Sequence, residues 1–143
     1  MSLFTSIFSS EAPQQTPGTK AVIFLMGTGN YEVEIVGEEH YQAALEGICG
    51  PRLPKRANRL ETAVLIVEDK NAHDKNVVRV EIRGRKVGYL SRETALVVRR
   101  QLKERGMPEV DGQCQAVIRG GWLSADGRRG PYCVSLDLPI WFY

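Results

Sequence analysis

The sequence predicts a mainly β protein with two helices (an α+β chain), folded as a small β-barrel. Several short segments alternate apolar and polar residues with a period of two, which is typical of half-buried strands. Two other segments space their apolar residues by three and four, as one face of a helix does. Most predicted strands follow one another without an intervening helix. This excludes a parallel α/β sheet and favours a closed or partly open barrel.

Length and composition indicate a single globular domain. The chain has 143 residues, of which 43% are hydrophobic and 25% are charged. Residues 1–19 are rich in Ser, Gln, Thr, Pro and Gly, so we expect a flexible tail there and a barrel domain over residues 20–143. No apolar run approaches the ~20 residues that span a bilayer, and we find no signal peptide, so we expect no membrane contact.

The cysteines argue against a disulfide framework and against a zinc site. There are three of them, widely spaced and without a Cys-x-x-Cys pair: Cys49, Cys114 and Cys133. Such cysteines suit a reducing cytoplasm, where we expect the protein to reside. We expect neither a metal nor another cofactor, and the sequence leaves the oligomeric state open.

The first half of the chain predicts two strands and a helix. An apolar run predicts a strand over 21–26, and alternation predicts a second over 31–36. Acids at Glu38 and Glu39 then precede a helix that ends before Pro51. A basic loop follows over 52–59. The helix places four residues on one face, namely Tyr41, Ala44, Leu45 and Ile48.

The second half predicts a hairpin, a helix and further strands. A polar segment over 68–76 precedes the hairpin, whose tight turn we expect at Gly84-Arg85. Ser91 is expected to cap the helix, which ends at Gly106 and Pro108. The predicted strands of this half cover residues 63–67, 78–82, 86–90, 113–118 and 132–138.

Charge is distributed unevenly along the chain. Residues 1–50 contain one Lys against six Glu (net −5), whereas residues 51–143 contain 18 Lys or Arg against 11 acids (net +7). This asymmetry points to a polyanionic partner, although the cations alternatively serve only to solvate the surface. The second helix buries Ala95, Val98 and Leu102. Its outward cations, which either solvate that face or track phosphates, are Arg92, Arg99, Arg100, Lys103 and Arg105.

Three blocks of the chain, in this order and spacing, resemble the motifs of HIRAN domains over about residues 31–138. The first is Val36-Gly37-Glu38 followed by Tyr41 and Leu45. The second is Asn-Ala-His-Asp-Lys-Asn-Val at 71–77, and the third is Lys-Val-Gly-Tyr-Leu-Ser-Arg-Glu at 86–93. The resemblance implies a modified OB-like or SH3-like barrel. It also implies a non-catalytic module of replication or repair that captures the 3′-hydroxyl end of single-stranded DNA, as in fork-remodelling helicases of the Swi/Snf kind.

The resemblance also implies a set of DNA-binding residues, beginning with the central motif. Asp74 would accept a hydrogen bond from the terminal hydroxyl, while the backbone around Asn71 and His73 would hold the last sugar. A carboxylate in this place also disfavours a 3′-phosphate by repulsion. The alternative is that Asp74 and Asn76 are ordinary turn residues that bond to their own backbone.

The remaining DNA-binding residues are aromatic or cationic. His40 and Tyr41 lie where the family places base-stacking rings, and Arg92 lies where a basic residue meets a phosphate. Tyr132 completes the set. For Tyr41 the helical spacing leaves a core position as an alternative to DNA contact.

The chain departs from the family pattern at four positions. Glu39 stands where eukaryotic members carry Arg, Ala72 replaces Pro, and His40 and His73 stand where the fork remodellers have Tyr. These differences make the chain similar to the stand-alone bacterial or phage branch of the family.

Two features near the C-terminus leave alternatives open. Trp122 and Arg128-Arg129 occupy a glycine-flanked hairpin tip, either as a second contact or as ordinary surface. The aromatic residues 141–143 form either an exposed tail or a clamp across the barrel.

Two competing functions remain from the sequence. An imagined hydrolytic centre of His40, Tyr41, His73 and Asp74 lacks support, because no nucleophile elbow, phosphate-binding loop or two-metal carboxylate cluster is present. A protein-interaction domain that docks a larger helicase or nuclease is the second alternative, and it is compatible with DNA binding.

Overall fold

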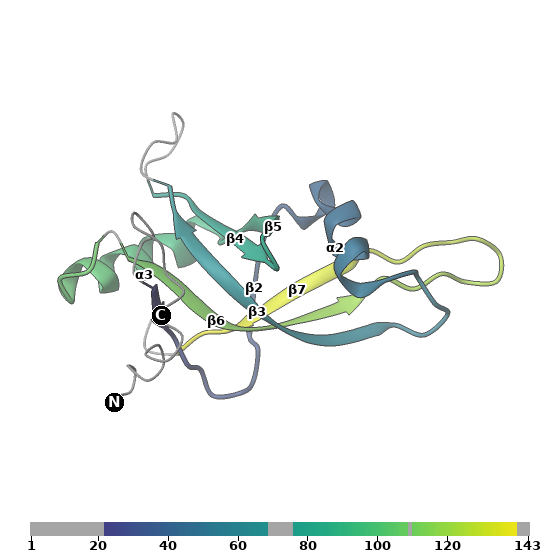
Figure 1. Ribbon diagram of the computed structural model, residues 1–143, viewed down its shortest axis with the longest axis horizontal. Coiled ribbons are helices and arrows are strands. Elements are labelled where there is room, and N and C mark those ends of the chain that lie inside the picture. Colours follow the sequence, from purple (N-terminus) through teal and green to yellow (C-terminus); the bar gives the residue numbers. More distant parts are fainter. Residues whose placement is uncertain (1–21, 69–75, 109, 140–143) are drawn as a thin grey trace.

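The computed structural model describes residues 22–68, 76–108 and 110–139. Within these residues, seven strands form one curled sheet, accompanied by helices α2 (Gln42–Cys49) and α3 (Arg92–Glu104) and the short 3-10 helix η2 (Glu38–His40) (Figure 1). This confirms the predicted mainly β fold with two helices and the predicted order of elements. The strands are β1 (Val22–Phe24), β2 (Val33–Glu34), β3 (Ala57–Val67), β4 (Val78–Ile82), β5 (Arg85–Tyr89), β6 (Asp111–Gly120) and β7 (Tyr132–Asp137). The expected tail at residues 1–19 lies outside the described residues.

The sheet curls into a small barrel that one residue pair closes. The strands follow the order β2-β7-β6-β3-β4-β5, and β1 pairs in parallel with the start of β6. Just after β2, Val36 pairs with Tyr89 at the end of β5. The Val36 N–H donates to the Tyr89 carbonyl (2.8 Å), and the Tyr89 N–H donates to the Val36 carbonyl (2.9 Å). This pair joins the first and last strands of the order, which satisfies backbone groups that an open edge would expose.

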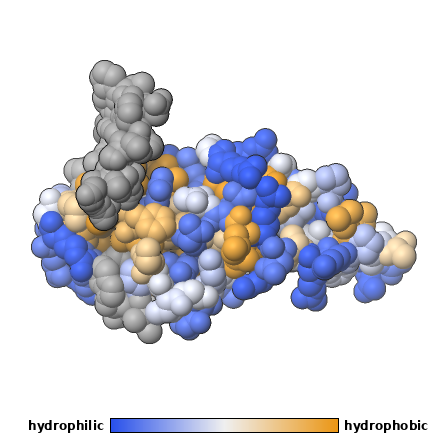
Figure 2. Space-filling view, turned by 60° about the horizontal axis from the view of Figure 1, so that its bottom comes forward, coloured by the Kyte–Doolittle hydropathy of each residue, from blue (hydrophilic) through white to orange (hydrophobic). Residues whose placement is uncertain are grey.

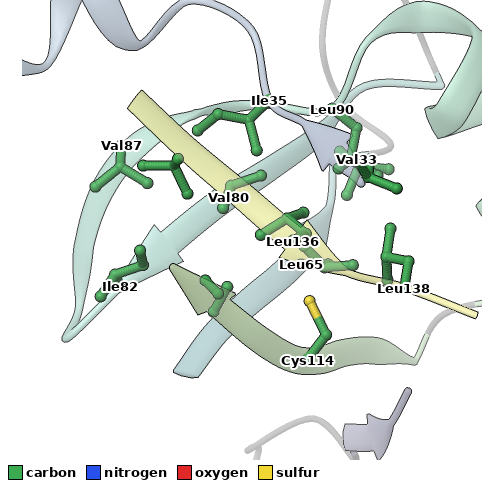
Figure 3. Close-up of a cluster of buried hydrophobic side chains, with 14 of the residues drawn as sticks. Val33, Ile35, Leu65, Val80, Ile82, Val87, Leu90, Cys114, Leu136 and Leu138 are labelled. Atoms are coloured by element: carbon green, nitrogen blue, oxygen red, sulfur yellow. The ribbon is translucent and has the colours of Figure 1, made fainter. Parts of the chain in front are cut away.

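The core lies inside this barrel. In β4, Val78, Val80 and Ile82 are fully buried, and the residues between them face outward, as the period of two predicts. Figure 3 shows Val80 converging with Ile35 of the β2 segment and Leu136 of β7. Apolar burial of this kind is worth about 1.5–3 kcal/mol per large side chain.

An arm projects from the barrel (Figure 1). It consists of the first part of β3, the last part of β6, the first part of β7 and the loops at their ends. Ala57 pairs with Gly120, which in turn pairs with Tyr132, so the three strands stay in register to the base of the β6–β7 connection. The prediction of a basic loop over 52–59 was therefore wrong for its last three residues, which belong to β3. β3 begins at Ala57, because pairing with β6 continues along the arm.

Helix α3 forms largely as predicted. Ser91 is its N-cap, and the Ser91 hydroxyl oxygen accepts a hydrogen bond from the Thr94 N–H (3.2 Å). The inward face is also confirmed, since Ala95, Val98 and Leu102 are at most 3% exposed. One expected outward cation differs, because Arg99 is half-buried.

Two further boundaries differ from the sequence prediction. The hairpin turn centres on Arg83-Gly84 rather than Gly84-Arg85, with φ values of 55° and 75°. Positive φ at both central residues matches a type I′ turn, which suits the twist of a two-residue hairpin. The strand expected over 31–36 is shorter, because Tyr31 adopts a φ of 51° and only Val33–Glu34 forms β2.

Candidate functional site

The closing seam of the barrel places η2 against β5. Gly37 follows Val36 and adopts a φ of 83°, a left-handed conformation that glycine tolerates and that turns the chain into η2. A Cβ built on Gly37 would lie 3.7 Å from Cδ2 of Tyr89, so the tyrosine ring lies beside this turn. The residues after the turn, His40 and Tyr41, are thereby held next to β5.

A β-bulge in β5 turns Lys86 and Tyr89 to the same side. Lys86 pairs with Glu81 and Tyr89 pairs with Arg79, and the register shifts between Val80 and Glu81. Arg79 and Glu81 share the outer face of β4, since they are two residues apart. Their partners on β5 therefore share that face, although Lys86 and Tyr89 are three residues apart. The bulge absorbs the extra residue and re-aims a side chain.

Lys86 lies between two aromatic rings on this face. Its Nζ is 4.7 Å from the centroid of the Tyr89 ring and 5.4 Å from that of Tyr41. Hydrogen bonding with the Tyr89 side chain raises the pKa of Lys86; partial burial opposes this rise, and a hydrogen bond with Tyr41 adds to it. The ammonium group of Lys86 is therefore held in its charged form.

His40 extends the aromatic surface at its η2 end. Its ring packs edge-on to that of Tyr41, with the centroids 6.5 Å apart, and its side chain is 74% exposed. We call the group His40, Tyr41, Lys86 and Tyr89 the η2–β5 surface. It presents partly exposed π-faces around one cation, which is the chemistry needed to stack bases beside a phosphate backbone.

Gln42 anchors the start of α2 to the barrel. Its Oε1 accepts a hydrogen bond from the Tyr132 N–H (2.8 Å), and its Nε2 donates to the Tyr132 carbonyl (3.1 Å) and to the Glu38 carbonyl (2.9 Å). The side-chain amide thus acts as a short piece of partner strand for β7. Because Tyr41 directly precedes Gln42, this anchor also holds the backbone of Tyr41 in place.

Helix α3 begins just after the C-terminal end of β5. The Leu90 N–H donates to the Val78 carbonyl (3.0 Å), and Arg92 opens the helix two residues later, where its side chain is exposed. The Glu68 N–H donates to the Val77 carbonyl (3.0 Å), so the two ends of the β3–β4 connection meet beside this helix start. A helix N-terminus favours anions.

The described residues include only some of the predicted site. His40, Tyr41 and Arg92 lie on η2, before α2 and at the start of α3. Asn71, His73 and Asp74 lie outside the described residues.

The structure corrects the prediction for Tyr132. Its side chain is 1% exposed, and the Arg52 guanidinium carbon lies 4.7 Å from its ring centroid. A Cβ on Gly121 would lie 2.0 Å from Tyr132 Cε1, so the backbone covers the ring as well. A buried ring offers no face to a base. Tyr132 is therefore a core residue that stabilises the base of the arm.

Sequence reasoning missed Lys86 and Tyr89 as site residues. In a regular strand, residues three apart point to opposite faces, so the alternation pattern separates them. The signal available in the sequence was Gly88 between them, because a glycine inside a strand often marks a bulge. In the structure, a Cβ at Gly88 would lie 2.7 Å from the Val36 carbonyl oxygen, which explains why the seam requires glycine there.

The described residues offer neither a metal site nor a membrane-spanning helix. Over residues 22–68, 76–108 and 110–139, no group of three or more His, Cys, Asp or Glu side chains is placed to hold a metal ion. Among the helices of this part of the chain, none combines the length and the apolar character needed to cross a membrane.

A small β-barrel whose seam carries cationic and aromatic side chains defines a binding domain. The sequence model of the HIRAN domain matches residues 28–116, which is more than half of the chain. The protein therefore belongs to the HIRAN domain family, a family of DNA-binding domains that are generally non-catalytic.

The chain is also similar to one solved structure, the HIRAN domain of human HLTF. The two share 16% sequence identity over 73% of this chain and 70% of the other, with a TM-score of 0.35. No curated protein matches the chain.

Proposed function

We propose that this domain is a non-catalytic module that binds single-stranded DNA at the η2–β5 surface and recognises its 3′-hydroxyl end with the segment that joins β3 to β4. The observation that carries the proposal is the position of Lys86 between the rings of Tyr41 and Tyr89 at the barrel seam. Membership of a DNA-binding family supports the nature of the ligand.

Stacking and charge together account for binding of a single strand. Aromatic stacking contributes about 1–3 kcal/mol per base and is open only to bases that are not already stacked in a duplex. Lys86 adds a cation beside those rings. Both interactions tolerate any base, so we expect little dependence on sequence.

The acids of η2 direct the path of the DNA backbone. Glu39 lies beside His40, with 3.6 Å between its Oε2 and the imidazole Nε2, and its side chain is 71% exposed. A phosphate next to Glu39 would be repelled. The phosphates therefore run past Lys86 toward Arg92 and the start of α3, and the bases face the aromatic rings.

End selectivity rests on the segment that joins β3 to β4. Following the family motif, we assign the terminal hydroxyl to Asp74 and the last sugar to the backbone near Asn71 and His73. The two ends of this segment meet beside the start of α3, near the expected phosphate path. An acceptor carboxylate favours a 3′-hydroxyl and repels a 3′-phosphate.

One binding experiment tests both parts of the proposal. Fluorescence anisotropy compares labelled single strands that end in a 3′-hydroxyl or a 3′-phosphate, all blocked at the 5′ end. The wild-type protein is expected to prefer the 3′-hydroxyl, and Asp74→Asn is expected to lose that preference. Equal affinity of the wild type for both ends contradicts end recognition and leaves general single-strand binding.

A variant of the described surface tests the location of the site. Lys86→Gln is expected to weaken binding of both oligonucleotides, because it removes the cation between the rings. Lys103→Gln, an exposed lysine on α3, is the matched control and is expected to bind like the wild type. An equal loss in the two variants would mean that general charge, and not the η2–β5 surface, holds the DNA.

A further inference from the structure

The arm concentrates the positive charge of the protein. Its two stretches, residues 50–60 and 118–133, contain seven Lys or Arg and a single acid, Asp126. The arm therefore carries a net charge of +6, whereas the whole chain carries only +2. Figure 2 shows hydrophilic residues on the projecting end beside a hydrophobic patch, while more of the hydrophobic surface lies at the barrel end.

Beyond residue 60, in contrast, acids of β3 and β4 neutralise nearby cations, including Arg59 at the edge of the arm. Glu61 pairs with Arg59 and Arg83, through contacts of 2.6 and 3.0 Å. Arg79 pairs with Glu81 at 2.9 Å and also with Glu68. These pairs leave little net charge on that part of the surface.

Four cations of the arm lack such a partner. Arg52 pairs with Glu46, Arg59 with Glu61 and Arg128 with Asp126. The other four are exposed and form no ion pair with any described residue, namely Lys55, Arg56, Arg119 and Arg129.

Backbone and side-chain contacts hold the two stretches of the arm together. Leu53 pairs with Trp122, and the Leu123 N–H donates to the Leu53 carbonyl (2.9 Å), which ties the loop before β3 to the β6–β7 connection. Arg52 donates to the Gly130 carbonyl, and its side chain is only 7% exposed. A Cβ on Gly130 would lie 2.1 Å from Trp122 Nε1, so the indole packs directly on that backbone.

We propose that the arm is a second DNA contact, which binds the phosphate backbone of the same strand beyond the nucleotides held at the η2–β5 surface. This inference rests on the proposed function. Four unneutralised cations on a stiff support match a regularly charged polyanion and lose little entropy on binding it. The arm exposes two large apolar side chains, Leu53 and Leu60, against seven cations. This excess of charge favours a polyanion over an apolar partner such as the interior of a membrane.

The test measures salt dependence with short and long single strands. The arm variant replaces all four cations (Lys55→Gln, Arg56→Gln, Arg119→Gln and Arg129→Gln). The matched control removes two exposed cations of α3 (Arg100→Gln and Lys103→Gln). Oligonucleotides of about four and about sixteen nucleotides represent the two ends of the usual footprint of an OB-like barrel. Circular dichroism checks that each variant is folded.

The expected result is specific to the long strand. Each lost phosphate contact lowers the slope of log K against log salt by about 0.7, so the arm variant is expected to lose up to about 3 in slope on the long strand. Its binding of the short strand is expected to be unchanged. The α3 control is expected to lose less slope than the arm variant.

The other outcomes separate failure of this inference from failure of the proposed function. An unchanged slope in the arm variant, or an equal loss in the α3 control, overturns the arm contact and leaves the η2–β5 surface intact. Polyglutamate serves as a second polyanion. If the arm variant loses polyglutamate binding and DNA binding to the same extent, the arm is a general anion surface, and this outcome also overturns the proposed DNA contact. A wild-type protein that binds neither strand overturns the proposed function itself.

Discussion

Lys86 and Tyr89 face the same side of β5 although they are three positions apart, and Lys86 Nζ lies 4.7 Å from the centroid of the Tyr89 ring. The bulge that produces this arrangement lies beside the pair that closes the barrel, Val36 with Tyr89. Tyr89 therefore takes part both in the pair that closes the fold and in the aromatic and cationic surface that the bulge builds. Changes at the seam should affect stability and DNA binding together.

Replacement of Tyr89 by Ala is expected to weaken single-strand binding about tenfold or more. The variant removes one stacking face, worth about 1–3 kcal/mol. Tyr89→Phe keeps the face and loses only the hydroxyl, so its affinity should remain close to that of the wild type. Anisotropy titration with one oligonucleotide measures both. If Tyr89→Phe loses as much DNA affinity as Tyr89→Ala, the hydroxyl group and not stacking is responsible for the contribution of Tyr89 to binding.

Gly88→Ala is expected to destabilise the protein by about 1–3 kcal/mol. The new Cβ would lie 2.7 Å from the Val36 carbonyl oxygen and 2.8 Å from Cδ1 of Ile35, so the backbone of the closing pair has to move. Urea unfolding measures the loss. Gly84→Asn is the control, because the hairpin turn offers open space and suits Asn at positive φ. Equal stability of Gly88→Ala and the wild type would show that the seam is loose.

Gln42→Ala is expected to lower the free energy of unfolding by about 1–3 kcal/mol, because the backbone groups of Tyr132 lose their partner. It should also weaken DNA binding, since Gln42 fixes the neighbouring Tyr41. Thermal unfolding and anisotropy provide the two measurements. Gln101→Ala on α3 serves as the control. A variant that loses stability yet binds DNA normally would mean that Tyr41 is positioned by other contacts.

Glu61→Gln is expected to destabilise the protein at neutral pH and much less in acid. Partial burial by itself raises the pKa of Glu61, but hydrogen bonds and charges from Arg59 and Arg83 outweigh it and lower the pKa below the usual 4.5. A carboxyl with a lowered folded pKa adds stability above its unfolded value, and this stability is lost as the pH falls through the folded pKa.

Urea unfolding at about pH 7 and about pH 3 measures this effect. Exposed Glu32 provides the control variant, Glu32→Gln, which should change stability little at either pH. A difference between wild type and Glu61→Gln that stays constant with pH would contradict the assigned ion pairs.

Local patterns in the sequence predicted the elements correctly where local physics decides them. Alternation predicted β4, helical spacing predicted α2 and α3, and the serine before a helical pattern predicted the cap at Ser91. Boundaries were less well predicted, since the turn at Arg83-Gly84 and the early start of β3 depend on pairing with other strands.

The candidate site was predictable only in part. His40, Tyr41 and Arg92 were assigned from the family motif, and they lie on elements that meet at the two ends of β5. The prediction that Tyr132 contacts DNA was wrong, because the sequence does not reveal that Arg52 and Gly121 cover its ring.

The sequence by itself determined the mainly β composition, the order of the elements, the family and the excess of cations after residue 50. Each of these depends on residues that are close in the chain. Only the tertiary structure decided that Val36 meets Tyr89, that Lys86 lies between two tyrosines, and that four cations without an ion pair to any described residue lie together on one arm. These arrangements depend on strand register and on contacts between distant segments, and a one-residue bulge is enough to change which side chains share a face.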